Sequence, residues 1–337
     1  MLLVSAIGYH PIEVLVQPDQ PDPLIVELEP VPPTLRELGV AGTAQQVTGS
    51  DNNWVVDGTA TRSVPASVEP DLFRALALAP AVSFSSIRSS RPLVRGIDAD
   101  DVAFTIDGHE VVNLYHIGRS FSAFPALLAE AVSVRTQPAA VDVGRTTSGR
   151  IEIRGAEWAP GRRTELQYGI GAWTGLTGWS DEALSMVAGV RTFEGSVAAV
   201  AAPDGANSLE VQDFYGRVDI RQAIPLKLTF FRSTDRGADT DPRHGDLATL
   251  DWESWLVGAK ADLLRLPWLG LDLRAAYSSR AERGEDVPAR RTTLMVDNHV
   301  ARSGVGFDGR LGMVDGAATL RFGGEMADRR VLNRITP

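Results

Sequence analysis

The chain has 337 residues and no cysteine, and its 43 acidic against 33 basic residues give a net charge of −10. This balance leaves no basic surface to neutralise phosphates, which argues against nucleic acid as a partner, and the lack of cysteine excludes disulfides, thiolate metal sites and cysteine nucleophiles. No run of 18 apolar residues predicts a membrane-spanning helix, although a transmembrane β-strand needs only about ten residues of alternating character.

The first zone, residues 1–33, contains two short β-like runs, Ile12–Val16 and Leu24–Leu28. Proline-aspartate repeats separate them, and the zone ends in a proline-rich stretch that no helix can cross. The first ten residues lack the basic region of a signal peptide. We predict the last two strands of a small β-domain that begins before this sequence.

Residues 34–59 are small and polar and predict a linker, and residues 60–157 predict a mixed α/β domain. A short helix is expected at 67–80, with Ser67 as its cap, Pro70 in its first turn and Pro80 at its end. A hairpin is expected at 102–112, because apolar residues alternate up to an Asp107-Gly108 turn. A second short helix is expected from Ser122 to about residue 132, followed by strands at 131–137 and 148–156.

From residue 158 onward, alternating strands replace helical periodicity. In one of them, Leu226, Leu228 and Phe230 lie on one face, and Lys227 and Thr229 on the other. At roughly 20 residues per strand and loop, about nine strands are expected. Short connections such as 313–318 alternate with long ones such as 233–249, which favours a membrane barrel; a soluble β-sandwich is the alternative. Several tryptophans of this zone are expected near strand ends, which suits an aromatic girdle; the zone contains Trp173, Trp179, Trp252, Trp255 and Trp268.

The sequence contains no complete motif for catalysis or cofactor binding. Gly169, Gly171 and Gly175 are not followed by a helix, as a nucleotide loop requires, and no G-x-S-x-G is present. His244 stands among acidic residues in a loop, and the acidic run at 98–101 lacks the ligand spacing of a calcium loop. We therefore expect neither an enzyme nor a bound cofactor or metal.

Residues 71–155 resemble the plug domain of TonB-dependent outer-membrane receptors. The resemblance rests on an ordered set of motifs: "DLFRALALAPAV", "VRG" at 94–96, "IDG" at 106–108, the "FSAFPA" run and the turn from Gly144 to Gly149 into "IEI". It implies a plug at 60–157 inside a transmembrane β-barrel that starts at 158. Residues 1–33 resemble the end of the carboxypeptidase-regulatory-like domain that precedes many such plugs.

The resemblance also implies function and site residues. TonB would bind a short box in the linker, for which Glu37-Leu38-Gly39-Val40-Ala41 is the nearest match, although Gly39 interrupts the usual pattern. Arg95 and Gly96 belong to one plug motif and Asp107 and Gly108 to the other; we expect Arg95 to tether the plug to the barrel wall. Ligand contacts are expected from loop residues at the outer vestibule: Ser85, Ser86, Arg88, Tyr115, His116 and Arg119.

The implied activity is energised uptake of a scarce nutrient, such as a siderophore, cobalamin, glycan or peptide, across the bacterial outer membrane. TonB, outer-membrane lipid and a small ligand would be its partners. Because nine strands cannot enclose a plug of this size, we expect the sequence to be incomplete at both ends. The alternative is a soluble or cell-surface protein whose α/β domain and β-sandwich bind a partner or a glycan.

Overall fold

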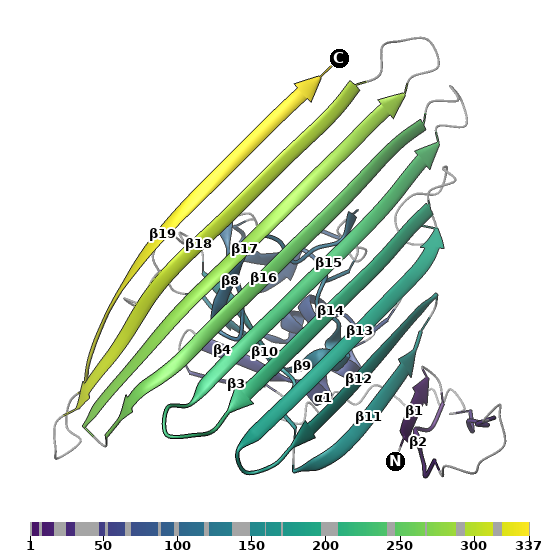
Figure 1. Ribbon diagram of the computed structural model, residues 1–337. Coiled ribbons are helices and arrows are strands. Elements are labelled where there is room, and N and C mark those ends of the chain that lie inside the picture. Colours follow the sequence, from purple (N-terminus) through teal and green to yellow (C-terminus); the bar gives the residue numbers. More distant parts are fainter. Residues whose placement is uncertain are drawn as a thin grey trace.

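A computed structural model describes residues 2–6, 9–16, 25–30, 47–50, 53–64, 69–86, 89–97, 101–117, 121–136, 149–158, 160–169, 171–196, 208–240, 247–266, 268–287, 294–312 and 319–336. Its main feature is a single broad sheet with a smaller domain on one side (Figure 1). No helix among these residues is long and apolar enough to cross a membrane.

The broad sheet contains nine consecutive antiparallel strands between residues 161 and 336, as many as the alternation predicts. Each pairs with the next in sequence, so the chain meanders across the sheet. The strands are β11 (Gly161–Tyr168), β12 (Ala172–Ser180), β13 (Leu184–Ser196), β14 (Ser208–Ile220), β15 (Leu226–Thr240), β16 (Leu247–Arg265), β17 (Leu269–Val287), β18 (Leu294–Gly312) and β19 (Thr319–Thr336).

Several strands are longer than predicted. β16, β17 and β18 each have 19 residues, and β15 and β16 occupy most of the segment 233–249 that was expected to be a loop. At about 3.3 Å per residue, 19 residues reach about 60 Å, twice the thickness of a hydrocarbon core. The wall therefore extends well beyond the apolar layer that it is suited to span.

The smaller domain is built on a six-stranded sheet in the order β3-β4-β9-β10-β7-β8. β10 runs parallel to β7 and antiparallel to β9. Two of these strands and a helix come from residues 47–63, so the second half of the expected linker is part of the domain. The elements are β3 (Val47–Ser50), β4 (Asn53–Asp57), α1 (Gly58–Ser63), β7 (Ala103–Ile106), β8 (His109–Val111), β9 (Ala129–Arg135) and β10 (Arg150–Gly155).

The sequence predicts some of the turns and short helices of this domain correctly. Asp107 (φ 51°) and Gly108 (φ 85°) form the predicted two-residue hairpin turn. The first expected helix is α2 (Leu72–Ala75) continued by a 3₁₀ turn, η1 (Leu76–Leu78), and its cap is Asp71, whose carboxylate accepts two backbone N–H bonds. Ser67 lies outside the described residues. The second expected helix is wrong: only a 3₁₀ turn, η4 (Ala126–Leu128), precedes β9.

The N-terminal strands extend the broad sheet at its first edge. β1 (Leu2–Ala6) pairs parallel with β11, and β2 (Ile12–Val14) pairs antiparallel with β1. β1 was not predicted, and the predicted strand Leu24–Leu28 is not formed by its described part, because Ile25–Glu29 carry no ladder. The assignment of residues 1–33 to a carboxypeptidase-regulatory-like domain stays a prediction.

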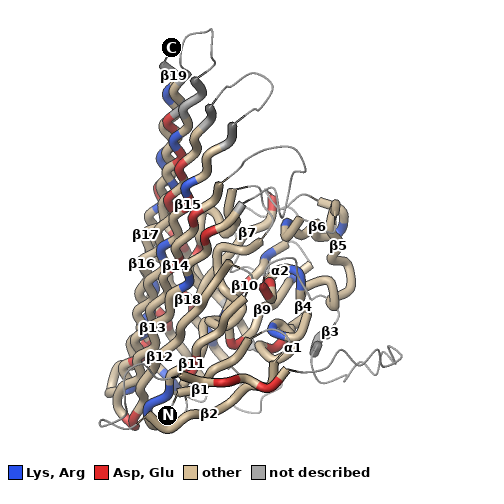
Figure 2. The backbone as a smooth tube through the Cα atoms, turned by 90° about the vertical axis from the view of Figure 1, so that its right-hand side faces the viewer, with Lys and Arg blue, Asp and Glu red and all other residues tan. Residues whose placement is uncertain are grey.

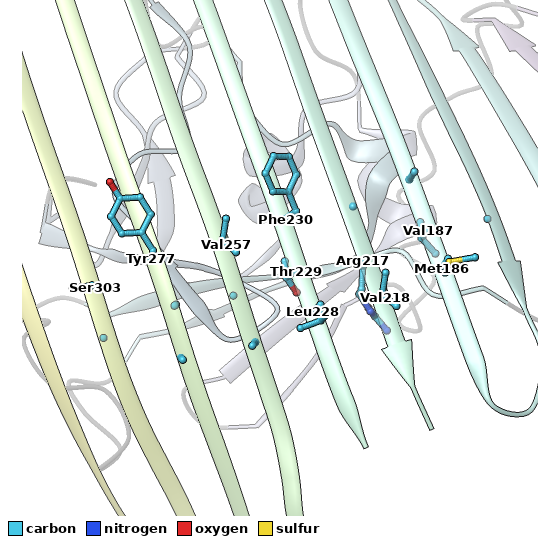
Figure 3. A pocket seen from close by; sticks show the side chains of 18 of the residues that line it. Met186, Val187, Arg217, Val218, Leu228, Thr229, Phe230, Val257, Tyr277 and Ser303 are labelled. Atoms are coloured by element: carbon cyan, nitrogen blue, oxygen red, sulfur yellow. The ribbon is translucent and has the colours of Figure 1, made fainter. Parts of the chain in front are cut away.

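The two faces of the broad sheet differ in what covers them. Side chains of β14 alternate between buried and exposed over residues 208–217, because every second one points toward the smaller domain. Met186, Leu228, Val257 and Tyr277 point the other way and are exposed (Figure 3). The smaller domain lies on one side only (Figure 2), so the described strands form no second layer and the sandwich prediction is wrong. An apolar sheet face without a covering layer is the arrangement of a lipid-facing wall.

Candidate functional site: the interface between plug-like domain and wall

A buried charge cluster joins the smaller domain to three wall strands. We use this name for Glu69 and His116 of the domain and Arg191, Asp213 and Asp235 of β13, β14 and β15. The Nε of Arg191 donates to Asp213 Oδ2 over 2.7 Å, and its Nη1 donates to Glu69. Nδ1 of His116 lies 2.5 Å from Asp235 Oδ1. Arg191 is only 1% exposed, and His116 is fully buried.

The same cluster holds the backbone of the domain loop that contains His116. The N–H of Ile117 donates to Asp235 Oδ2 over 2.7 Å, and Nη2 of Arg191 donates to the Ser122 carbonyl over 2.8 Å. Phe121 of this loop packs on Phe193, with ring centres 5.4 Å apart. Polar and aromatic contacts together therefore fix the loop from 116 to 122 on the wall.

The protonation of His116 is set by opposing effects. Burial lowers the pKa of His116, but the carboxylates of Asp235 and Asp213 outweigh it and raise the pKa to about 9. A protonated imidazole also brings the cluster closer to neutrality, since three carboxylates otherwise face one guanidinium. The raised pKa favours a cationic His116 at neutral pH, and it does so against the Nη2 of Arg191, a donor that lies 2.5 Å from the Nε2 of His116.

A second buried contact centres on the hairpin turn of the domain. Asp107 Oδ2 accepts hydrogen bonds from the Tyr215 hydroxyl over 2.8 Å and from Thr229 Oγ1 over 3.1 Å. Its Oδ1 accepts from the Gly155 N–H over 3.0 Å and lies 3.7 Å from Nη1 of Arg217. The carboxylate is thus shared between its own domain and two wall strands.

Glycines of the wall receive side chains of the smaller domain. A Cβ at Gly258 would lie 2.4 Å from the ring of His109, and one at Gly189 would lie 2.3 Å from a methyl of Leu128. Gly178 and Gly237 approach Trp158 and Ile117 in the same way; all four are inward positions of β12, β13, β15 and β16. The missing side chains let the wall accept the domain at close range.

The predicted ligand-contact residues are scattered. Tyr115 and His116, expected on an open loop, are buried, because Tyr115 packs on Phe73 and Phe104 and His116 lies in the charge cluster. Ser85 and Ser86 are exposed, at the end of β5 (Val82–Phe84), which pairs with β6 (Pro92–Val94). Arg88, Arg119 and the TonB-box candidates at 37–41 lie outside the described residues.

Arg95, which was expected to tether the plug to the wall, contacts its own domain among the described residues. Its side chain is exposed, and its Nη1 donates to the Thr136 carbonyl of its own domain over 3.2 Å. Arg95 has φ 56° and Gly96 φ 78°, so the "VRG" motif forms a turn. Asp107, which was assigned only a turn role, makes the wall contact instead.

The wall partners Arg191, Asp213, Tyr215 and Asp235 were not singled out from the sequence. Their signal is present but general: each is a polar or charged residue on the face of its strand opposite the exposed apolar side chains. The same holds for many lumen residues of any barrel. Only the position of the smaller domain distinguishes them.

The chain resembles known proteins in both sequence and fold. Residues 54–150 match the family model of the TonB-dependent Receptor Plug Domain, a range that includes β7, β8, β9 and nearly all of β4. No curated protein matches the sequence of the chain significantly.

Solved structures share the fold at low sequence identity. The alcaligin outer-membrane receptor FauA from Bordetella pertussis is 12% identical, with a TM-score of 0.60 over 86% of this chain and 57% of that one. The ferric-catecholate import receptor Fiu from E. coli is 14% identical (TM-score 0.59, 86% and 50%), and the siderophore receptor PirA from Acinetobacter baumannii is 12% identical (0.58, 84% and 48%). The chain thus spans about half the length of these receptors.

Proposed function

We propose that this chain, a TonB-dependent outer-membrane receptor by its plug domain and barrel fold, imports a scarce nutrient when TonB displaces the plug. The observation that carries the proposal is the plug–wall interface. It combines two buried polar contacts, at Asp107 and at the charge cluster, with apolar contacts such as those of Phe121 on Phe193 and Phe124 on Tyr215. Such an interface holds the plug at rest without a covalent link, so an applied force can separate the plug from the wall.

The energy-coupling part of the proposal rests on strand addition. A short extended segment before the plug can add to a sheet edge of TonB, and the main-chain hydrogen bonds of such a pairing can bear load. Residues 37–41 are our candidate segment. No covalent chemistry is assigned to the chain, and the energy would come from the inner membrane.

The cargo class favoured here is an iron complex of a siderophore. FauA and Fiu are described as an alcaligin receptor and a ferric-catecholate import receptor, and PirA as a siderophore receptor. These relatives differ among themselves in cargo, so the identity of the ligand is a proposal at the level of chemical class.

Uptake of iron-55 siderophore complexes by cells that express the protein tests this function. Deletion of residues 37–41 should leave the protein in the outer membrane and reduce uptake to the level of cells without TonB. Uptake that is independent of TonB, or a protein that fractionates as soluble without detergent, would contradict the proposal.

A further inference from the structure

His109 is a buried histidine between plug and wall that takes part neither in the charge cluster nor in the Asp107 contact. It begins β8, directly after the hairpin turn, and only 2% of it is exposed. Its ring lies against the backbone of β16, where a Cβ at Gly258 would come within 2.4 Å of the ring. The hairpin can therefore sit at this depth only because the wall residue opposite the ring is a glycine.

Both ring nitrogens of His109 are buried, and the described residues offer neither of them a hydrogen-bond partner. A neutral imidazole has one N–H donor and one acceptor, whereas a protonated imidazole has two donors and a full charge. An unpaired polar group costs free energy in a buried place, and an unpaired charge costs far more. The surroundings of His109 therefore tolerate the neutral ring and oppose the protonated one.

The wall charges that act on His109 are basic. Lys227 of β15 is the register partner of Lys260 of β16, which is in turn the partner of Arg274 of β17. Burial lowers the pKa of His109 most; the carboxylate of Asp107 raises it, and the three wall cations lower it further. The result is a pKa of about 4 in place of 6.5, so the ring is neutral at neutral pH.

The carboxylate that favours a charged His109 already has other partners. Among the charges that act on the ring, only that of Asp107 favours protonation. Its two oxygens accept one backbone N–H and two hydroxyls and lie near a guanidinium, which come from Gly155, Tyr215, Thr229 and Arg217. A protonated His109 would have to take Asp107 from these partners, which would then lose their own acceptor.

A cavity of about 60 Å³ lies beside the ring, between β8 and the wall strands β17 to β19. Its carboxylates are paired with arginines: Glu110 and Glu325 both contact Arg302, and Glu325 also lies 3.7 Å from Arg274. Arg150 of β10 adds a further cation to the lining. The space is large enough for water, which can carry protons to the ring while the plug is seated, so His109 can respond to the pH outside.

We propose that His109 makes the seating of the plug sensitive to acid: the neutral ring lets the hairpin pack on Gly258, and the protonated ring drives the hairpin from the wall. Seating is at full strength above pH 6.5 and weakens as the pH falls from 6.5 to 4, because the released plug binds a proton that the seated plug resists. The proposal concerns only the contact between plug and wall, so it does not depend on the cargo or on TonB.

Hydrogen–deuterium exchange, measured by mass spectrometry on protein purified from outer membranes in detergent, tests this proposal. Each rate is compared with the intrinsic exchange rate at the same pH, and this protection factor removes the direct effect of pH. Peptides from 103–112 report on the hairpin, and peptides from β16 report on the wall itself. His109→Phe keeps a ring against Gly258 but removes the titrating group, and His299→Phe on β18, outside the plug contact, is the matched control.

In the unaltered protein and in His299→Phe, protection of the hairpin should fall about tenfold or more between pH 6.5 and 4.5, while that of β16 stays within about twofold. In His109→Phe the hairpin should lose less than about threefold, and His109→Leu should repeat this result if the larger ring prevents folding.

Constant protection of the hairpin in the unaltered protein would overturn the proposal. An equal loss in both His109 variants would do so too, because it would assign the acid response to carboxylates. A parallel loss in β16 would show that acid unfolds the wall as a whole, which also contradicts a local effect of His109.

Discussion

The carboxylate of Asp107, on a two-residue turn of the plug, accepts the hydroxyl of Tyr215 from the middle of a wall strand over 2.8 Å. The turn places Asp107 at the tip of a rigid hairpin, and β14 holds Tyr215 at a fixed inward position. Two elements more than 100 residues apart are thus joined at positions where the backbone of each is fixed.

The contact between plug and wall can be followed with one introduced cysteine, because the chain has none of its own. Ser254 lies on the buried inward face of β16, so the rate at which a maleimide labels Ser254→Cys reports how often the plug leaves the wall.

The first prediction concerns the charge of Asp107. Asp107→Asn keeps a residue that tolerates positive φ but removes the negative charge that Arg217 and Tyr215 face. We expect the free energy that holds the plug against the wall to fall by about 1–3 kcal/mol. The cysteine at position 254 should then be labelled roughly 5- to 150-fold faster. Glu194→Gln, on an exposed part of β13, is the control and should leave the rate unchanged. Equal rates for both variants would refute the tether role of Asp107.

The second prediction concerns the buried guanidinium of the charge cluster. Arg191→Met leaves Glu69 buried without its cation and Asp213 with His116 alone, which should cost about 3–5 kcal/mol in the free energy of plug seating. The outward Arg232→Gln should cost less than about 1 kcal/mol, because its partner Glu253 is well exposed. If combining Arg191→Met with Glu69→Gln and Asp213→Asn recovers none of the loss in the labelling assay, unpaired charge is not the cause.

The third prediction concerns a glycine that accepts a plug side chain. Gly258→Ala places a methyl group against the ring of His109, and His109→Ala should relieve that clash. We expect Gly258→Ala to loosen the plug by about 1–3 kcal/mol and the double variant to recover most of it. On the outward face, the Cβ of Gly216→Ala meets its nearest atom, on Phe214, at 3.3 Å, so this control should be mild. Additive losses in the double variant would rule out direct contact.

The fourth prediction concerns pH. His116 has its pKa raised from 6.5 to about 9 in the folded protein, so its contribution to plug seating is fully present below pH 6.5. That contribution declines as pH rises and is lost above about pH 9, when the neutral imidazole no longer compensates Asp213 and Asp235. Because a maleimide reacts with the thiolate, labelling of any cysteine accelerates with pH, so each rate at position 254 is divided by the rate of the unfolded protein at the same pH. This corrected rate should rise between about pH 7 and 9.5. In a His116→Asn background the rise should vanish, and a rise that persists there would assign it to another group.

The pattern of the wall could be predicted from the sequence because it depends on local alternation. Leu228 and Phe230 are apolar, Thr229 between them is polar, and a strand must direct them to opposite faces. The number of strands follows from the length of the alternating region, and the Asp107-Gly108 turn needs only two residues that accept positive φ. The plug resemblance likewise rests on short motifs in order, and the family match at 54–150 agrees with it.

The helix expected after Ser122 shows where local reasoning fails. Residues 123–131 have good helical propensity, but β9 gains a ladder with both β4 and β10, and this tertiary pairing overrides propensity. Residues 47–57 were predicted to be linker, but they form two strands because β9 offers an edge to β4, and β4 in turn offers one to β3.

The sequence by itself determined that the chain alternates between a lipid-suited and a polar face, and that a plug-like domain precedes it. Only the tertiary structure decided which polar residues meet. His116 and Asp235 are 119 residues apart, and nothing in either neighbourhood specifies the other. Their pairing follows from seating one folded domain on another, where each buried charge must find a partner because water is excluded. Among the described residues, Arg95 bonds to its own domain, and Asp107 makes the wall contact.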